Sequence, residues 1–434
     1  MSQSRSTQPP LRPNVAHAWW PLALSWLLMG LELPLIAAVV GRLPQPELML
    51  AAFGGVAFPL GLLIESPIIM MLAASTAIAR DGEAWKRLNR WMHIVSAALT
   101  LLLVLLITTP LFELVVVDLL DVPEPVREPA WIGLLCLLPW PWAIADRRTR
   151  QGLLICYDRK IAVAQGTGIR LIATVSAIAV FAVSGADGIV VATGSLSVGV
   201  LVEAAWARWA ARHIVRGPLA SAKSEDVPFE LGALFRFYAP LALTPVLILL
   251  AQPLGTAGMT RMQQPVASMA VWAPLNGLVF LLRCTGIAFN EVVIAHVHEA
   301  NWLPALRRFA HQAGGVCSLV LAIVGIPAVG WLWFGIAQDL DGDLVDLGTA
   351  ALWLAAPVPW LTFMQSLHQG RLVAAHRTRA VTTSVMIFLI VTAGLLVGGV
   401  VIGRWPGLPV TVAAVTAGNA AQAAWLWLAA RTLP

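Results

Sequence analysis

The stretch Trp20-Pro21-Leu22-Ala23-Leu24 recurs 219 residues later as Ala239-Pro240-Leu241-Ala242-Leu243, and this recurrence decides how the chain is organised. Proline, tryptophan and glutamine are too uncommon in apolar sequence to keep one spacing by chance, so the matches predict an internal duplication. Further matches at an offset of 218 or 219 residues pair Pro34 with Pro253, Arg42 with Arg261, Gln45-Pro46 with Gln264-Pro265, Pro141-Trp142 with Pro359-Trp360, and Ala204-Ala205-Trp206 with Ala423-Ala424-Trp425.

The composition places the duplicated unit in a membrane. Of the 434 residues, 59% are hydrophobic and 12% are charged, whereas soluble domains are about 25% charged. Apolar runs long enough to cross the hydrocarbon layer as helices recur along the chain, without the alternation of an outer-membrane barrel. We therefore expect an all-α polytopic membrane protein with about twelve transmembrane helices. The expected spans are Trp19–Gly41, Leu48–Ala79, Met92–Val117, Trp131–Ile155, Ile161–Val183, Gly188–Trp209, Phe235–Gly258, Val266–Ala295, Gln312–Ile336, Leu347–Leu372, Val381–Ile402 and Val410–Ala429.

These spans divide into two lobes of six helices each. The expected parts are a cytoplasmic tail (1–18), a first lobe (19–213), a cytoplasmic linker (214–234) and a second lobe (235–434). Because six is even, both lobes enter the membrane from the same side, and an axis along the membrane normal should relate them. Parallel repeats of this kind are typical of transporters that bind solute between their lobes. A duplicated scaffold without transport is the alternative.

The loop charges predict the orientation. With the N-terminus inside, about 22 of the 28 Lys and Arg residues fall in cytoplasmic segments and about four lie outside. We therefore expect a multi-pass protein of the inner (plasma) membrane with both termini in the cytoplasm. The tail leads into the first span without a cleavage pattern, so that helix should be retained. The positive charge needs no nucleic acid to explain it, and the bilayer and a small solute are the expected partners, with no obligate protein partner.

Within this framework the residues resemble a known family of exporters. The segment Glu47-Leu48-Met49-Leu50-Ala51-Ala52-Phe53-Gly54, together with the basic return loop that follows the second span, resembles the multidrug and toxic compound extrusion fold. The spacing of Pro240-Leu241-Ala242-Leu243, Pro253 and Arg261 is closer to the progressive ankylosis protein family, although Gln252 stands where that family would have Arg. The resemblance implies a MATE-like secondary exporter that works by alternating access of its lobes and is coupled to a proton or sodium ion.

The substrate stays open among three classes. The resemblance to the progressive ankylosis family slightly favours a small organic anion such as citrate or pyrophosphate, whereas drug extruders favour an organic cation. A lipid or lipid-linked sugar flippase is the third possibility. We expect no enzyme, because none of the eight histidines stands in a metal motif. Without a phosphate-binding P-loop we expect no ATP-driven step, and no cofactor beyond the coupling ion.

Polar groups inside the membrane are the candidate site residues, because their burial is costly. Glu32 lies two residues before Pro34, where a proline kink frees a backbone carbonyl and lets water reach the carboxyl group. We therefore regard Glu32 as a candidate coupling site, the alternative being a carboxyl capped by neighbouring hydroxyls. Pro253 predicts the equivalent kink in the second lobe.

Glu65 and Arg283 form a second candidate constellation. The repeat places Arg283 on Ile64, next to Glu65, so opposite charges lie at similar depths on equivalent helices. One possibility is that they form an ion pair between the lobes that breaks as the lobes part. Another is that Arg283 binds an anionic substrate and Glu65 modulates that binding. The alternative without a function is a static buried ion pair. Gln252 and Asn276 are expected to line the second lobe, although hydrogen bonding between helices explains them equally well.

Arg150 and His368 occupy equivalent positions at the cytoplasmic ends of the fourth and tenth spans. An arginine fork suits a carboxylate or phosphate, so Arg150 predicts a basic vestibule for an acidic solute. Membrane orientation alone also explains a positive cluster at this edge. His368 is a candidate proton-sensitive group, although a lone histidine is more often structural.

Overall fold

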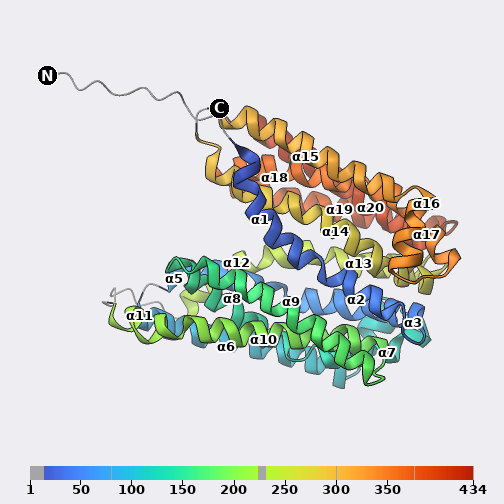
Figure 1. Ribbon diagram of the computed structural model, residues 1–434, viewed down its shortest axis with the longest axis horizontal. Helices are drawn as coiled ribbons and strands as arrows, with labels where there is room; N and C mark the ends of the chain where they lie inside the picture. The colour runs from blue at the N-terminus through green and yellow to red at the C-terminus, as the bar shows by residue number, and fades with distance from the viewer. Residues whose placement is uncertain (1–13, 80, 223–230, 300, 376, 434) are drawn as a thin grey trace.

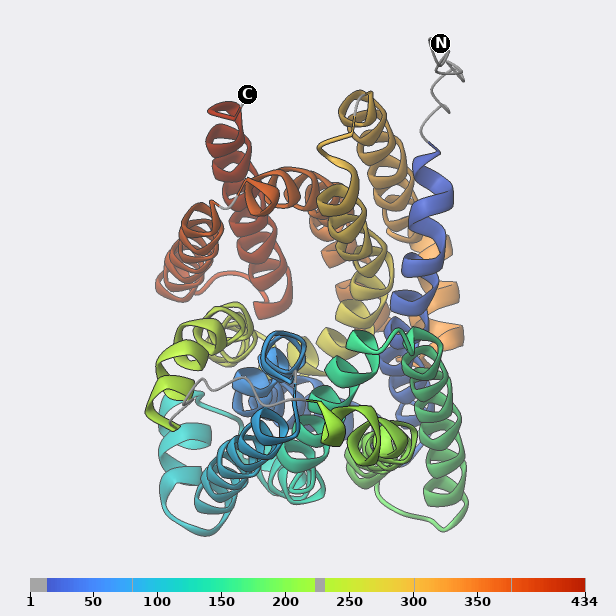
Figure 2. The same cartoon turned by 90° about the vertical axis from the view of Figure 1, so that its left-hand side faces the viewer.

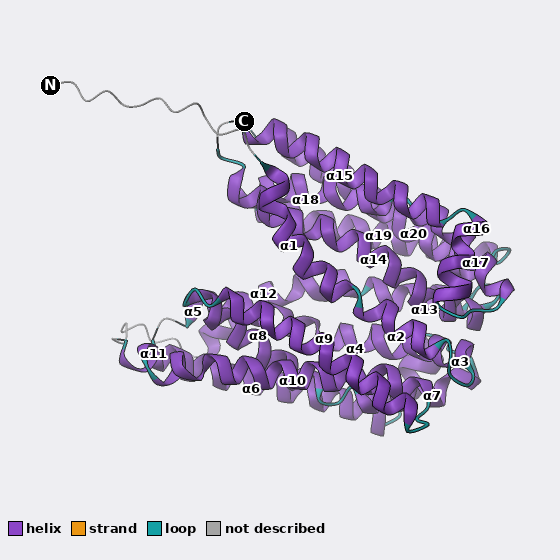
Figure 3. Ribbon diagram, in the orientation of Figure 1, coloured by secondary structure: helices purple, strands orange, loops and turns teal. Residues whose placement is uncertain are grey.

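The computed structural model describes residues 14–79, 81–222, 231–299, 301–375 and 377–433, which fold almost entirely into helices (Figure 3). The first repeat contains α1 (Val15–Gly30), α2 (Glu32–Val40), α3 (Pro46–Leu50), η1 (Ala51–Ala57), α4 (Phe58–Glu65), η2 (Ser66–Met70), α5 (Met71–Ile78), α6 (Gly82–Thr108), η3 (Glu113–Leu119), α7 (Glu124–Cys136), α8 (Trp140–Cys156), α9 (Lys160–Val183) and α10 (Gly188–Arg216). After α11 (Pro218–Ser221), the second repeat contains α12 (Leu231–Leu249), α13 (Ala251–Thr260), α14 (Pro265–His296), α15 (Trp302–Val324), α16 (Pro327–Gly330), η4 (Trp331–Ala337), α17 (Gly342–Ala355), α18 (Val358–Ala374), α19 (Thr378–Ile402) and α20 (Gly407–Arg431).

Each of the twelve predicted spans lies on one described helix or on a consecutive run of them. Within the described residues, nine helices are long and apolar enough to cross a membrane, and a pair bent by 86° after α15 makes a tenth. The run α7–α8 does not qualify, since Asp146 and three arginines make it too polar. Helix α20 does not qualify either, because its glycines, Asn419 and Gln422 lower its mean hydropathy. The prediction of an all-α polytopic membrane protein is confirmed.

The observed helix ends differ from the predicted ones where capping groups or prolines act. The third span starts ten residues early, because the Asp81 side chain accepts hydrogen bonds from the backbone N–H groups of Glu83 (2.8 Å) and Ala84 (2.9 Å). It breaks near Pro110, and the fourth and tenth spans break near Pro139 and Pro357, because proline removes a backbone donor.

The predicted tail and linker lie only partly in the described part of the chain. Helix α1 begins at Val15, four residues before the predicted start, while residues 1–13 are outside the described ranges. Helices α10 and α12 extend into both ends of the predicted linker, 214–234, of which 223–230 are outside the described ranges.

The helices gather into two bundles that diverge toward one end (Figure 1). We call the end that carries both termini the terminal face, which Figure 2 views directly, and the end that carries the connections after α2 and η3 the far face. The first bundle consists mainly of helices of the first repeat and the second bundle of helices of the second repeat.

The first helix of each repeat packs against the opposite bundle near the terminal face. Trp19 of α1 donates from its indole N–H to the carbonyl of Thr285 on α14 (2.8 Å). Its equivalent, Tyr238 of α12, donates from its hydroxyl to the carbonyl of Pro67 on η2. At the offset of 219 residues Thr285 corresponds to Ser66, the residue next to Pro67, so the first helix of each repeat makes nearly the same contact with the other repeat.

The far face is joined by a second reciprocal pair of contacts, which we call the arginine clamp. Arg42, at the end of α2, donates to the carbonyls of Ile336 (2.7 Å) and Ala337 (2.9 Å) in η4. Arg261, at the end of α13, donates to the equivalent carbonyls in η3, those of Asp118 (3.2 Å) and Leu119 (2.9 Å). The clamp therefore ties each repeat to the other at the end where the bundles meet.

The two bundles touch directly where Gly54 of η1 faces Ala273 of α14. A Cβ atom on Gly54 would lie 2.4 Å from the Ala273 Cβ, closer than two such atoms can approach. These residues are 219 positions apart, so they are equivalents in contact, and the pseudo-two-fold axis passes between them. Because the reciprocal contacts lie at both ends of the molecule, this axis runs from the terminal face to the far face, as the even number of spans predicts.

Gly54→Ala should lower the free energy of unfolding by about 1–3 kcal/mol, the typical cost of overpacking a close contact. The double variant Gly54→Ala/Ala273→Gly should recover part of the loss. Gly398→Ala on α19 is the matched control, because nothing lies within 4 Å of its added Cβ atom. Thermal unfolding in detergent measures all three, and equal melting temperatures for Gly54→Ala and Gly398→Ala would contradict the contact.

Candidate functional site

A break in the first span places a carboxyl group between the bundles. Helix α1 ends at Gly30 and α2 begins at Glu32, one turn before Pro34. The equivalent break separates α12 from α13, one turn before Pro253. On one side of this break, a Cβ on Gly30 would lie 3.2 Å from a Leu281 side-chain atom, so α1 packs closely on α14.

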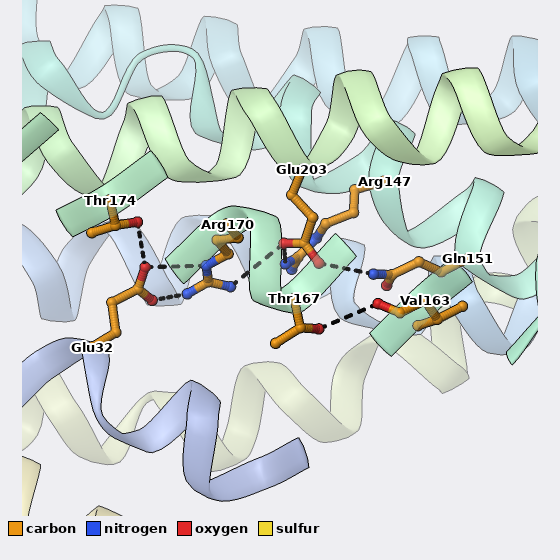
Figure 4. Close-up of polar contacts among 8 residues, drawn as sticks. All are labelled: Glu32, Arg147, Gln151, Val163, Thr167, Arg170, Thr174 and Glu203. Atoms are coloured by element: carbon orange, nitrogen blue, oxygen red, sulfur yellow. Dashed lines mark hydrogen bonds and ion pairs between the residues drawn. The ribbon is translucent and has the colours of Figure 1, made fainter. Parts of the chain in front are cut away.

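Glu32 points from this break into the first bundle, where it meets Arg170 of α9 (Figure 4). The Arg170 guanidinium binds both carboxylate oxygens, with Nε 3.2 Å from Oε1, and the Thr174 hydroxyl donates to Oε1 at 2.8 Å. Glu32 is 4% exposed, so its ion pair is buried. The pair connects a helix that packs on the second bundle to a helix of the first bundle.

The ion pair continues into a chain of charges. Arg170 lies 3.9 Å from Glu203 of α10, and Glu203 is bound in turn by the Arg147 guanidinium and by the Gln151 amide (3.1 Å), both on α8 (Figure 4). Glu203 is 1% exposed and Arg147 5%. A buried pair at this depth is tolerated only because each partner satisfies the other. We call Glu32, Arg170, Glu203 and Arg147 the charge chain.

Glu65 and Arg148 lie beside the charge chain without completing it. Glu65 ends α4 and is 7% exposed, and its Oε2 atom has no hydrogen-bond partner among the described residues, as is also true of Arg148 Nε. The cationic groups that act on Glu65 are Arg147, Arg148 and Arg170. The charge chain together with Glu65 and Arg148 thus contains three arginines and three glutamates, whose charges cancel when all six are ionised. Protonation of any one glutamate leaves one net positive charge.

Arg283 stands apart from these groups. It lies on α14 between Asn276 and Asn290, at seven-residue intervals that put all three on one helical face. Within the described part of the chain no carboxylate pairs with it, and Arg283 Nε and Asn290 Oδ1 have no hydrogen-bond partner there. Asn276 and Gln252 line a small pocket between the bundles, with Phe53 and Phe58 on its other wall.

The remaining predicted residues lie elsewhere. Glu65 and Arg283, both described, form no ion pair in this structure, so that pairing stays a prediction for a conformation in which the bundles approach. Arg150 is held by Asp146 on its own helix (2.9 Å) and lies over the Trp85 ring, so it offers no open fork to a solute. His368 lies on α18, among basic residues of the second bundle and away from the charge chain.

From the sequence, Arg147 counts only as part of the basic end of the fourth span, and Arg170 and Glu203 are expected either to pair or to face the cytoplasm, without a part in the site. The signal was a difference between the repeats. The equivalents of Arg147 and Glu203 are Gln365 and Gln422, and Gln365 instead donates to Asn419 of α20. The second repeat thus keeps the helices and replaces these two charges with amides.

Solved structures with a similar arrangement of helices identify the fold of the chain. No protein-family model matches the chain, and no curated protein sequence matches it. Among solved structures, a MATE-family multidrug resistance transporter of the MOP superfamily in an inward-facing conformation is similar with a TM-score of 0.72 at 14% identity, covering 95% of this chain and 97% of its own. The lipid II flippase MurJ, in an inward closed conformation, gives 0.68 at 12% identity, covering 97% and 88%.

A third structure is a MOP superfamily transporter from Pyrococcus furiosus, described as having a binding pocket of reverse polarity that suggests a different function. It gives a TM-score of 0.59 at 17% identity, covering 97% of this chain and 96% of its own. The chain therefore has the MATE-like fold. The finer resemblance to the progressive ankylosis family stays a prediction.

Glu203→Gln should destabilise the protein by about 3–5 kcal/mol, because it leaves Arg147 as an uncompensated buried charge. Glu83→Gln, which breaks an exposed pair with Lys86 on α6, should leave stability unchanged and serves as the control. The measurement is thermal unfolding of the purified protein in detergent. A Glu203→Gln protein as stable as the control would show that the charge chain does not hold the first bundle together.

Proposed function

We propose that the protein is a secondary transporter that exports a small organic anion by alternating access of its two bundles, coupled to a proton. The observation that carries the proposal is the unequal charge of the two sides. The charge chain, Glu65 and Arg148 balance each other in the first bundle, whereas Arg283 in the second bundle lacks a counter-ion among the described residues. An anionic solute supplies that counter-ion.

Glu32 is the proposed coupling group. Its carboxylate holds Arg170, so a proton on Glu32 releases that guanidinium to a second ligand. The same proton loosens the start of α2 from the first bundle, directly after α1, which packs on α14. Proton binding thus acts on a helix that links the bundles.

The arginine clamp and the diverging ends define the proposed resting state. With the far face tied by Arg42 and Arg261, solute enters from the terminal face. The excess of basic residues at that face supports a cytoplasmic position for it, and hence an inward-facing carrier of the plasma membrane. The similarity to an inward-facing transporter supports the same state.

Arg283→Gln should abolish most anion transport, by about tenfold or more, because a charge-assisted contact to the solute contributes about 1.5–3 kcal/mol. Uptake of labelled citrate and of a labelled organic cation into proteoliposomes, each with and without a pH gradient, measures the effect. Arg236→Gln on the exposed surface of α12 is the matched control. If the wild-type protein transported only the cation, the drug-extruder function would replace the proposed anion export. If it transported neither solute but scrambled a labelled lipid-linked sugar, the flippase function would be favoured.

Glu32→Gln should remove the dependence of transport on the pH gradient, because an amide cannot take up the coupling proton. Exchange of anion across the membrane without a gradient should continue in the variant. Glu47→Gln, on α3 near the far face, is the control and should keep the wild-type response. If Glu32→Gln remained as responsive to the gradient as Glu47→Gln, the coupling role would pass to another group, Glu65 first.

A further inference from the structure

The second bundle carries a cluster of basic side chains that the proposed transport cycle does not use. Arg307 and His311 lie on α15, and His368 and Arg371 lie on the neighbouring α18 (Figure 1). Arg307, His311 and Arg371 are the charged groups that act on His368. We call these four residues the basic cluster.

The basic cluster is buried in part, and within the described ranges it has no counter-ion. His368 and Arg371 are each 8% exposed, and His368 Nδ1 has no hydrogen-bond partner among the described residues. No salt bridge joins the cluster to a carboxylate in the described part of the chain. Arg371 thus holds its charge at a largely buried position with no carboxylate beside it among the described residues, and an anion would compensate that charge.

Comparison with the first repeat shows that the cluster is not a requirement of the fold. The equivalents of Arg307 and Arg371 are the uncharged Asn89 and Leu153. The equivalent of His368 is Arg150, which Asp146 neutralises, but Met364 replaces that aspartate in the second repeat. One repeat therefore supplies its own acid and the other does not.

The depth of the cluster matches the headgroup region of a bilayer. Arg371 and His368 lie three and six residues before the end of α18, which is roughly 5–9 Å from its terminal-face end at 1.5 Å per residue. Basic pockets between transmembrane helices at this depth bind the phosphate groups of anionic lipids.

An apolar track leads from the cluster toward the middle of the membrane. On α15, Arg307, His311, Gly315 and Leu319 follow each other at intervals of four residues, along one side of the helix. Nothing lies within 4 Å of the position of a Cβ atom on Gly315, and Leu319 is 60% exposed. A phosphate at the cluster would place an acyl chain in this open strip.

We propose that the basic cluster and the strip at Gly315 form a binding site for one anionic phospholipid of the terminal-face leaflet. The lipid phosphate supplies negative charge to Arg371 and a hydrogen-bond partner to His368, and an acyl chain lies over Gly315 and Leu319. The site is on the second bundle, separate from the charge chain, so its occupancy is independent of the proposed transported solute.

The test is titration of the purified protein, in neutral detergent, with dioleoyl phosphatidylglycerol, dioleoyl phosphatidylcholine and inorganic phosphate. Native mass spectrometry counts bound lipid, and the melting temperature reports stabilisation. Phosphatidylglycerol should bind at least fivefold more tightly than phosphatidylcholine, since one basic residue contributes about that factor at an anionic headgroup. Phosphate alone should give little stabilisation.

Variants distinguish lipid binding at this site from general electrostatic attraction to the basic surface. Arg307→Gln and Arg371→Gln should each weaken phosphatidylglycerol binding about fivefold, and Gly315→Leu should weaken it without changing any charge. Arg308→Gln is the control, because Arg308 is the adjacent exposed arginine on the same helix. Arg307 is also exposed, so its variant stays informative if Arg371→Gln fails to fold. Equal binding of the two lipids, equal stabilisation by phosphate, or an equal loss in Arg308→Gln would overturn the proposal.

Discussion

The contact of Gly54 with Ala273 brings two equivalent residues together on the pseudo-two-fold axis, and the rest of the architecture depends on it. Equivalent residues can meet only on the symmetry axis, and there only if they are small. With larger side chains the helices η1 and α14 would separate, and neither the exchange of α1 and α12 nor the arginine clamp could form with its present geometry. A tight contact at one point also leaves the bundles free to rotate about it, which suits a rocking carrier.

Symmetry of the backbone and asymmetry of the charges have different consequences. The backbone repeats in detail: Gln45 and Gln264 both adopt a left-handed conformation, with φ values of 55° and 54°. The charge chain occurs only in the first repeat, and the basic cluster only in the second. Duplication thus built the frame, while substitution on that frame divided the proposed tasks between the two bundles.

Hydrophobic length and the repeat offset predicted the all-α membrane fold and the direction of the axis, whereas nine or ten of the twelve expected spans qualify by length and hydropathy among the described residues. They could not predict the charge chain, because Glu32, Arg170 and Glu203 lie far apart in sequence and a hydropathy pattern does not record which helices become neighbours. The hypothesis for Glu65 and Arg283 relied on similar depth alone, and depth does not establish distance when the bundles diverge. The signal for Arg150 was present in the sequence, because Asp146 precedes it by four residues, the spacing of an ion pair within one helix.

The claim that the bundles rock about the Gly54–Ala273 contact is tested most directly by measuring distances between spin labels with pulsed electron paramagnetic resonance in lipid nanodiscs. Spin labels would replace Glu124 and Asp346 at the far face, and His213 and Thr432 at the terminal face, with the native cysteines removed. Acidification with citrate present should shift the two distances in opposite senses, lengthening the far-face distance as the terminal-face distance shortens. Distances that stay fixed, or that change together in one sense, would contradict the account.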